Sequence, residues 1–327
     1  MRIAFLGTPE FAVPSLKMLI ADGHGIEVFT QPDRPKDRGH ALAMPAVKLA
    51  ALEAGLTVHQ FERIRFPEGV EALRAFAPDL MVTAAFGQLL SQENLDIPKY
   101  GTINVHGSLL PAYRGASPIQ TAIINGEIET GVTTMLTALG MDTGDILLKR
   151  TVTIGENETY GELYARLAEE GALLLHDTIE ALEAGTLEPT AQDGALATYC
   201  RPIRKQDALI DFSKDSQSIH NLVRGLCPAP TAFALLEGQN IKLFETRLIP
   251  EPESFRGVDL TGYLSAEPGE CVVASPKQGL AVRTGSGFIE IAELQFPNGK
   301  RMAARAALNG KKLSGKRFFA SEPWAEC

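Results

Sequence analysis

Long apolar runs are absent from this chain of 327 residues. No stretch approaches the roughly 18 consecutive apolar residues of a membrane-spanning helix, and the apolar run that precedes Glu10 is too short for a signal peptide. Hydrophobic residues at 45% and charged residues at 22% are ordinary for a globular enzyme. We therefore expect a cytoplasmic protein that makes no contact with a membrane.

Closely spaced cysteines and clustered histidines are also missing. The four cysteines form no C-x-x-C pair, and the six histidines are scattered along the chain. Metal sites and disulfide frameworks depend on such spacings, so we expect free thiols and no metal. The first strand ends at Gly7 with one glycine of the G-x-G-x-x-G fingerprint, which argues against a nicotinamide dinucleotide.

The length suits two domains. Short apolar strands alternate with helices over the first part of the chain, and the first helix is expected to begin at Thr8 as its N-cap. This alternation predicts an α/β fold with a doubly wound, mostly parallel sheet. The expected strands cover residues 2–6, 26–30, 56–61, 79–84, 102–105, 131–136 and 146–154, and the expected helices include residues 45–54, 67–76, 119–125 and a long one from 159 to 185.

From Lys205 onward the pattern changes to short strands separated by glycine-rich turns. A strand at residues 207–212, a helix at 216–226 and five further strands suit a small OB-like β-barrel. Such a barrel is a frequent nucleic-acid platform, and a packing or dimerisation domain is the alternative. We expect a catalytic domain at residues 1–188, a linker at 189–204 and a C-terminal domain at 205–327.

Polar residues concentrate inside apolar surroundings at residues 101–148. Asn104 and His106 alternate along a short apolar strand, so both side chains leave the same face. Asp142 lies in a glycine-flanked loop after the next strand. A β-α-β unit of this length would lay the two strands parallel and close, which would bring Asp142 to His106.

These three residue types suit acyl transfer. A carboxylate held against an imidazole fixes its tautomer and favours proton uptake at the other nitrogen, and an amide can donate to a developing oxyanion. Ser108 lies outside any G-x-S-x-G elbow, so we expect a substrate to supply the nucleophile. Taken singly, His106 could be a structural residue and Asp142 a turn former. The three together favour a catalytic site.

The ordered motifs N-V-H-G-S-L-L-P from Asn104, R-G-A-S-P from Arg114 and D-T-G-D from Asp142 resemble the signature of the 10-formyltetrahydrofolate-dependent formyltransferases. The resemblance implies 10-formyltetrahydrofolate as co-substrate and a catalytic trio of Asn104, His106 and Asp142. It also implies folate contacts at two segments, although the second could equally be core packing. These segments are Ser108, Leu109, Leu110 and Pro111, and Phe86, Gly87, Gln88 and Leu89.

Residues 31–40 hold two prolines and a glycine, which predicts a loop at the edge where open α/β sheets bind ligands. The loop carries Arg34, Lys36 and Arg38, and an idle surface loop is the alternative. A similar Q-P-D-R-P insertion contacts the acceptor arm in family members that act on methionyl-tRNA. The match ends at Pro35, and the resemblance implies tRNA contacts in this loop. Because the neighbouring Gly39 lets the backbone come close to a partner, we expect Arg38 to affect the choice between tRNAs most.

The net charge of −9 argues against a nucleic-acid partner for the chain as a whole. Residues 300–317, however, contain seven basic residues and no acidic one. We call this set the basic stripe: Lys300, Arg301, Arg305, Lys311, Lys312, Lys316 and Arg317. It predicts phosphate contacts, above all at the first five, and a solvated face or frayed tail is the alternative.

The expected reaction is formyl transfer from 10-formyltetrahydrofolate to the α-amine of initiator methionyl-tRNA, by a monomer without a metal. The first rival is a formyltransferase that acts on a small amine, such as glycinamide ribonucleotide or an amino sugar nucleotide. Such an enzyme needs neither the loop nor a basic barrel. The second rival is a tRNA-binding protein whose formyltransferase-like domain is inactive. The presence of all three residues of the trio argues against it.

Overall fold

The computed structural model describes residues 1–36 and 41–320. The chain divides into two compact units. The first contains Met1–Pro118, Glu129–Thr153 and Leu163–Arg201, and the second contains Ile119–Ile128, Ile154–Glu162 and Pro202–Cys327. Each unit has its own sheet and its own buried core, as the length predicts.

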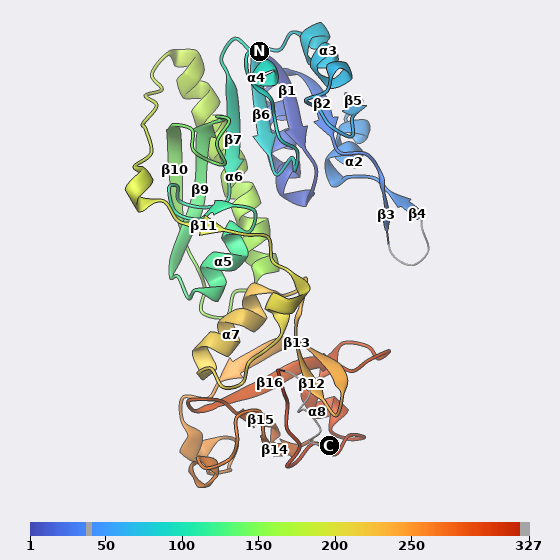
Figure 1. Cartoon of the computed structure of the whole chain (residues 1–327), viewed down its shortest axis with the longest axis vertical. Coiled ribbons are helices and arrows are strands. Elements are labelled where there is room, and N and C mark those ends of the chain that lie inside the picture. The colour runs from blue at the N-terminus through green and yellow to red at the C-terminus, as the bar shows by residue number, and fades with distance from the viewer. Residues whose placement is uncertain (37–40, 321–327) are drawn as a thin grey trace, which may run out of the picture. The chain divides into compact units, whose positions relative to one another are not determined.

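A seven-stranded sheet forms the centre of the first unit, in the order β10-β9-β7-β6-β1-β2-β5 (Figure 1). Every neighbouring pair from β7 to β5 is parallel, whereas β9 runs antiparallel to both β7 and β10. The mostly parallel sheet is therefore confirmed. The strands are β1 (Arg2–Gly7), β2 (Gly25–Thr30), β5 (Thr57–Gln60), β6 (Leu80–Ala84), β7 (Thr102–His106), β9 (Glu129–Leu136) and β10 (Ile146–Thr153).

Helices cover both faces of this sheet. On one face Gly171 of the long helix α6 lies so close that an added Cβ would be 2.9 Å from Val105 Cγ1 of β7. On the other face Leu73 and Phe76 of α3 pack in one apolar cluster with Leu6 of β1. The helices that cluster with this unit are η1 (Glu10–Ala12), α1 (Val13–Ala21), α2 (Ala46–Glu53), α3 (Pro67–Phe76), α4 (Gln92–Leu95), most of α6 (Tyr160–Ala184) and η2 (Gly194–Leu196).

The second unit is built on an antiparallel sheet of order β12-β13-β16-β15-β14, with β17 paired to β16. Residues 316–319 hydrogen-bond to both edges of this sheet, at Leu235 of β12 and at Cys271 of β14. The sheet is therefore consistent with the expected small barrel. Its elements are α5 (Pro118–Ile124), η3 (Lys205–Ala208), α7 (Ser216–Gly225), β12 (Ala232–Leu236), β13 (Gln239–Leu248), η4 (Pro252–Ser254), η5 (Thr261–Tyr263), β14 (Cys271–Ser275), β15 (Gly279–Arg283), β16 (Phe288–Gln295), β17 (Met302–Ala303) and α8 (Ala304–Ala307).

The expected parallel pairing of the two strands around the polar segment is wrong. Strand β9 pairs antiparallel with β7, so that His106 faces Thr133 and Asn104 faces Met135. The reason is that α5 is not a crossover helix on the sheet, because Ile119–Ile128 clusters with the second unit. The chain therefore re-enters the first sheet at the same edge at which β7 leaves it, and β9 runs antiparallel to β7.

The expected N-cap at Thr8 is also wrong. The chain after β1 forms η1, whose N-cap is Pro9. The Thr8 hydroxyl instead donates to the carbonyl of Phe86 at 2.9 Å. This bond ties together the chain segments that follow β1 and β6, two neighbouring strands of the sheet.

Three stretches of expected loop, linker or strand differ from the structure. The loop at residues 31–40 contributes β3 (Arg34–Lys36), which pairs antiparallel with β4 (Ala41–Ala43). The stretch expected as a linker, residues 189–204, contributes β11 (Tyr199–Cys200), which pairs with β8 (Arg114–Gly115) of the first unit. The expected strand at residues 207–212 is η3 followed by a single bridge at Leu209.

Candidate active site

The end of β7 presents two polar side chains on one face of the sheet. Asn104 and His106 alternate with Val105, which contacts α6 on the other face. Thr83 of β6 stands directly beside Asn104 in the parallel register, and its hydroxyl donates to Asn104 Oδ1 at 2.8 Å. This bond occupies the oxygen end of the amide. The Asn104 NH₂ group is left as the end that can donate to a bound molecule.

His106 is nearly buried, with 7% of its side chain exposed. Its Nε2 lies 3.0 Å from the carbonyl oxygen of Tyr113. A carbonyl oxygen can only accept, so Nε2 carries the proton and the lone pair of the neutral ring sits on Nδ1. Asp142 Oδ2 lies 3.8 Å from Nδ1, too far for a direct hydrogen bond. The carboxylate therefore faces the nitrogen that can take up a proton, and Tyr113 fixes the tautomer.

Asp142 is held in an uncommon backbone conformation by its surroundings. Its φ is +52°, in the left-handed region that few non-glycine residues adopt. Its Oδ2 accepts the backbone N–H of Gly115 at 2.8 Å. At Gly144 an added Cβ would lie 1.7 Å from the Leu136 carbonyl oxygen, so this close return of the loop requires glycine.

Gln192 braces the Asp142 loop from a distant part of the chain. Its Nε2 donates to the carbonyl oxygens of Asp142 at 2.9 Å and Gly144 at 2.7 Å. Its Oε1 accepts from Arg114 Nη2 at 2.7 Å and from Arg114 Nε at 3.1 Å. One amide therefore links the Asp142 loop to β8, and β8 also carries the Gly115 N–H that binds the Asp142 carboxylate.

The turn after His106 is held by one hydrogen bond within the turn and one from β9. Ser108 Oγ donates to the carbonyl of Ala112 at 2.6 Å, and Thr133 Oγ1 donates to the carbonyl of Ser108 at 2.7 Å. The peptide bond between Leu110 and Pro111 is cis. Ser108 is fully buried and its hydroxyl is committed to the turn, which agrees with its expected lack of a nucleophilic role.

Within the two expected folate segments, exposure separates the residues. Ser108, Leu110 and Phe86 are buried, and Gln88 spends its side-chain amide on the backbone of residues 61 and 64. The other four positions of the two segments are accessible to solvent. These are Leu109 and Pro111, both half-buried, and Gly87 and Leu89, both exposed.

The loop at residues 31–40 is anchored at its start by contacts of Asp33. Lys48 Nζ lies 2.8 Å from Asp33 Oδ2, and Gln60 Nε2 donates to Asp33 Oδ1 at 2.8 Å. The hydrogen bonds from Lys48 hold the pKa of Asp33 below its usual value. After Asp33, Arg34 forms an exposed ion pair with Glu62 at 2.9 Å. Lys36 is the last residue of β3, and Arg38 lies outside the described residues.

The basic stripe lies on the second unit, and four of its members form hydrogen bonds or ion pairs there. Arg301 pairs with Glu293, and Arg305 donates to the carbonyls of residues 276 and 277. Lys316 pairs with Glu237, and Arg317 donates to the carbonyl of Pro268. Lys311 lies over the Phe296 ring. Within residues 41–320, Lys300, Lys311 and Lys312 form no ion pair.

Sequence reasoning missed Thr83, Tyr113 and Gln192. Thr83 is the single polar residue of the strand sequence L-M-V-T-A and stands next to a catalytic candidate, so a pairing argument could have found it. Tyr113 acts through its backbone and Gln192 lies in the expected linker, so neither carried a local signal. Among the described residues no cluster of His, Cys, Asp or Glu is arranged to hold a metal ion, and no helix there is long and apolar enough to cross a bilayer.

Comparison with known proteins assigns both units to one family. The formyl transferase model matches residues 1–179, and the model of the formyl transferase C-terminal domain matches residues 202–312. The chain therefore belongs to the formyl transferase family.

Two curated relatives carry a more specific name. The methionyl-tRNA formyltransferase of Ruminiclostridium cellulolyticum is 48% identical over 314 residues, which is 96% of this chain and 97% of the relative. That of Citrifermentans bemidjiense is 46% identical over 96% of this chain and 94% of the relative.

Solved structures share the fold at lower identity. The sugar 3N-formyl transferase WlaRD, solved in the presence of dTDP and 5-N-formyl-THF, aligns with a TM-score of 0.65 and 21% identity over 92% of this chain and 99% of its own. HypX from Aquifex aeolicus, in complex with tetrahydrofolic acid, aligns with a TM-score of 0.63 and 18% identity over 94% of this chain and 47% of its own. These likenesses concern the fold.

Proposed function

We propose that this protein is an enzyme that transfers the formyl group of 10-formyltetrahydrofolate to the α-amine of initiator methionyl-tRNA. The observation that carries the proposal is the near-complete alignment, at 48% identity, with a methionyl-tRNA formyltransferase. The two family models match residues 1–179 and 202–312, so the similarity extends over both units. N-formylmethionyl-tRNA, the product, serves translation initiation, and we expect the enzyme to act as a cytoplasmic monomer.

The trio at the end of β7 can perform the transfer. The co-substrate supplies an activated formyl group, and the amine nitrogen of methionine forms a bond to the formyl carbon while the bond from that carbon to folate N10 breaks. We assign the proton of the attacking amine to His106 Nδ1, the nitrogen that carries the lone pair. The Asp142 carboxylate, 3.8 Å away, stabilises the resulting imidazolium by charge.

Asn104 is assigned to the developing oxyanion. As the amine adds, the formyl oxygen gains negative charge, and a donor fixed in advance stabilises that charge most effectively. Thr83 fixes the amide by occupying its oxygen, which leaves the NH₂ group as the end that can donate to the oxyanion. Folate N10 must gain a proton as it leaves, and protonated His106 is the group placed to return it.

The residues around the trio fit a folate. Leu109, Pro111 and Leu89 expose apolar surface at the carboxyl edge of the sheet, which suits a flat heterocycle. We assign the tRNA to the basic residues. Lys300, Lys311 and Lys312 are the strongest candidates for phosphates because they are exposed and form no ion pair within the described residues. Arg301 and Arg305 already bind groups of the second unit, the Glu293 carboxylate and the Pro276 carbonyl.

A side-by-side assay tests the proposal. The enzyme and 10-formyltetrahydrofolate are offered methionyl-tRNA, free methionine and glycinamide ribonucleotide separately. We expect formylation of methionyl-tRNA to dominate. Comparable formylation of either small amine would instead support the small-substrate alternative, and no formylation of any acceptor would support an inactive tRNA-binding protein.

A further inference from the structure

A pocket of about 1270 Å³ lies in the second unit. Its walls are formed by α7, β13 and two chain segments, residues 124–128 and 154–162, all of which cluster with this unit. None of its lining residues belongs to the trio or to the candidate folate segments. The volume is sufficient for a small organic molecule.

Arg224 of α7 is buried in the wall of this pocket, with 6% of its surface exposed. Its Nε donates to Asn221 Oδ1 at 3.0 Å, and its Nη1 donates to the carbonyl oxygens of Gly155 at 3.1 Å and Glu158 at 3.2 Å. These bonds hold the guanidinium in place. Within residues 1–36 and 41–320, its Nη2 has no hydrogen-bond partner.

The charge of Arg224 also lacks a direct counterion. Burial lowers its pKa, but a guanidinium stays charged in a protein. The Glu158 carboxylate favours the charged form from a distance, and it accepts the Gly155 N–H at 2.9 Å. No ion pair joins Arg224 to a carboxylate in the described part of the chain. Buried charges are normally paired, so this arginine suits a ligand that supplies the negative charge.

Asn221 offers a second donor beside the arginine. It lies one helical turn before Arg224 on α7 and is 4% exposed. Arg224 Nε can only donate, so the amide oxygen must face it, and Gln217 Nε2 donates to the same oxygen at 3.0 Å. The Nδ2 end has no hydrogen-bond partner among the described residues. An added Cβ at Gly126 would lie 3.0 Å from this nitrogen, so the glycine leaves room beside it.

Both unpartnered nitrogens reach accessible space. Among the described residues, the fully enclosed polar side-chain atoms without a hydrogen bond are the hydroxyls of Thr30, Thr102 and Thr137. Arg224 Nη2 and Asn221 Nδ2 are not among them, so each has accessible surface, and both residues line the pocket. Two fixed N–H donors, one of them charged, are suited to an oxyanion.

The other charges of the lining limit the charge of that oxyanion. Four glutamates line the pocket: Glu127, Glu156, Glu162 and Glu245. Arg247 and Arg301 line it as well, but they already pair with Glu245 and Glu293. The lining therefore offers one arginine, Arg224, to an anion. Further negative charge on the ligand would face the glutamates, which disfavours a phosphate dianion or a row of RNA phosphates.

Apolar side chains share the lining with these charges: Ile124, Ile128, Ile154, Phe244 and Leu248. Ile128 is 77% exposed, although isoleucine is among the residues most often buried. Its apolar surface is therefore open to contact. A ligand with an apolar body would be stabilised by covering that surface.

We propose that the second unit binds a small molecule that carries a single carboxylate on an apolar body, and that Arg224 Nη2 and Asn221 Nδ2 bind the carboxylate. This inference goes beyond formyl transfer and does not depend on it. A phosphate ester presents similar oxygen atoms with more charge, so the test separates the two.

The experiment uses three probes with one ring and different head groups: benzoate, benzamide and phenyl phosphate. Their binding to the intact protein is measured by calorimetry at neutral pH and constant ionic strength. We expect benzoate to bind most tightly. Benzamide and phenyl phosphate should bind about 10-fold more weakly or less, the scale of one lost charge-assisted hydrogen bond. This comparison needs no variant.

Asn221→Asp locates the binding site. The new carboxylate keeps an oxygen for Gln217 and for Arg224 Nε, but it replaces the Nδ2 donor and gives the arginine an internal counterion. It should weaken benzoate binding about 10-fold or more. Circular dichroism checks that the variant folds.

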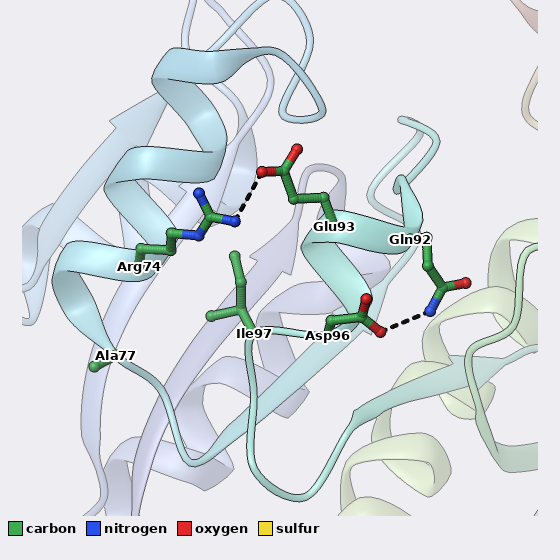
Figure 2. A pocket seen from close by; sticks show the side chains of 6 residues that line it. All are labelled: Arg74, Ala77, Gln92, Glu93, Asp96 and Ile97. Carbon is green, nitrogen blue, oxygen red and sulfur yellow. Dashed lines mark hydrogen bonds and ion pairs between the residues drawn. The ribbon is translucent and has the colours of Figure 1, made fainter.

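Gln92→Glu is the matched control, because it makes the same change from amide to carboxylate in a separate pocket of the first unit (Figure 2). There Gln92 donates to Asp96 at 2.7 Å, and Arg74 already pairs with Glu93 at 2.8 Å. We expect this variant to bind benzoate as the wild type does.

Equal affinity of the wild type for benzoate and benzamide, or no binding of either, would overturn the inference. Tighter binding of phenyl phosphate would assign the pocket to phosphate instead. Wild-type affinity for benzoate in folded Asn221→Asp would place the ligand elsewhere on the protein. Loss of affinity for methionyl-tRNA in that variant, with no benzoate binding by the wild type, would assign the pocket to RNA.

Discussion

The end of β7 and the basic stripe are both polar, but they are built in opposite ways. Around the end of β7, His106 is nearly buried, Asn104 and Asp142 are half-buried, and each is held by a further group: Thr83 holds Asn104, Tyr113 holds His106, and Gly115 holds Asp142. In the stripe, the lysines that have no ion pair within the described residues are exposed. Fixed groups that are shielded from solvent act strongly and are much less screened by salt, whereas exposed charges act weakly and are screened.

The comparison teaches where substitutions should matter. Changes at β7 should lower the rate by orders of magnitude, because transition-state stabilisation depends on fixed geometry. Changes in the stripe should weaken binding by smaller factors that shrink as salt is added.

The largest effect is expected from the proton-handling pair. Asp142→Asn keeps an oxygen for the Gly115 N–H but removes the charge, and His106→Ala removes the base. Each should lower kcat by about 10²–10⁴ while the thermal unfolding midpoint stays close to that of the wild type. Steady-state kinetics with methionyl-tRNA checks the first statement and circular dichroism the second. Near-normal kcat in both folded variants would remove the pair from the mechanism.

Asn104→Ala should cost about 10²–10³ in kcat, because it removes a donor to the oxyanion. Thr83→Val keeps the shape of the Thr83 side chain but frees the Asn104 amide to rotate. We therefore expect it to lower kcat as well, by a smaller factor than Asn104→Ala does. Measurement of kcat and KM for both variants tests the assignment of Asn104 to the oxyanion. If Asn104→Ala changed only KM, Asn104 would be a binding residue.

Gln192→Ala should lower kcat by about 10- to 100-fold, since it releases the Asp142 loop from two hydrogen bonds. Gln192→Glu is the informative partner, because a carboxylate can still accept from Arg114 but cannot donate to the carbonyls of Asp142 and Gly144. We expect it to be impaired as well. Wild-type kcat in Gln192→Glu would show that the bonds to the loop are unimportant.

Reversal of charge at Lys311 and Lys312 should weaken tRNA binding about 2- to 30-fold. The plot of log affinity against log salt should become shallower by about one for each lysine that contacts a phosphate. Lys242→Glu/Lys277→Glu, with the same charge change outside the stripe, is the control. Unchanged affinity and slope in the stripe variant would make these lysines a solvated surface.

The smallest effect concerns stability. His220 is buried, and its two ring nitrogens lie 3.0 Å from Thr246 Oγ1 and 3.3 Å from the Glu156 carbonyl oxygen. Burial lowers its pKa. The stabilisation by neutral His220 is therefore complete above about pH 6.5, the usual histidine value, and is lost as the pH falls toward the lowered value. The difference in unfolding free energy between the wild type and His220→Gln should shrink as the pH falls below 6.5, by at most about 1.4 kcal/mol per pH unit. A constant difference would contradict this.

Local patterns predicted most of the elements, and the differences have physical causes. Helix α3 begins and ends as expected because Pro67 opens it and an apolar face runs along it. The antiparallel pairing of β7 and β9 was not predictable, because it depends on α5 clustering with the other unit. The convergence of Asn104 and His106 follows from strand alternation. The brace at Gln192 does not, because contacts so distant in sequence leave no local periodicity.

The central claim is that His106 and Asp142 act as one unit in the chemical step. Single-turnover rates of formyl transfer, with saturating folate and methionyl-tRNA, test it in the wild type, His106→Ala, Asp142→Asn and the double variant. Because the carboxylate acts only through the imidazole, the double variant should be no slower than His106→Ala alone. Costs that multiply in the double variant would show that the two residues act independently, and would contradict the account.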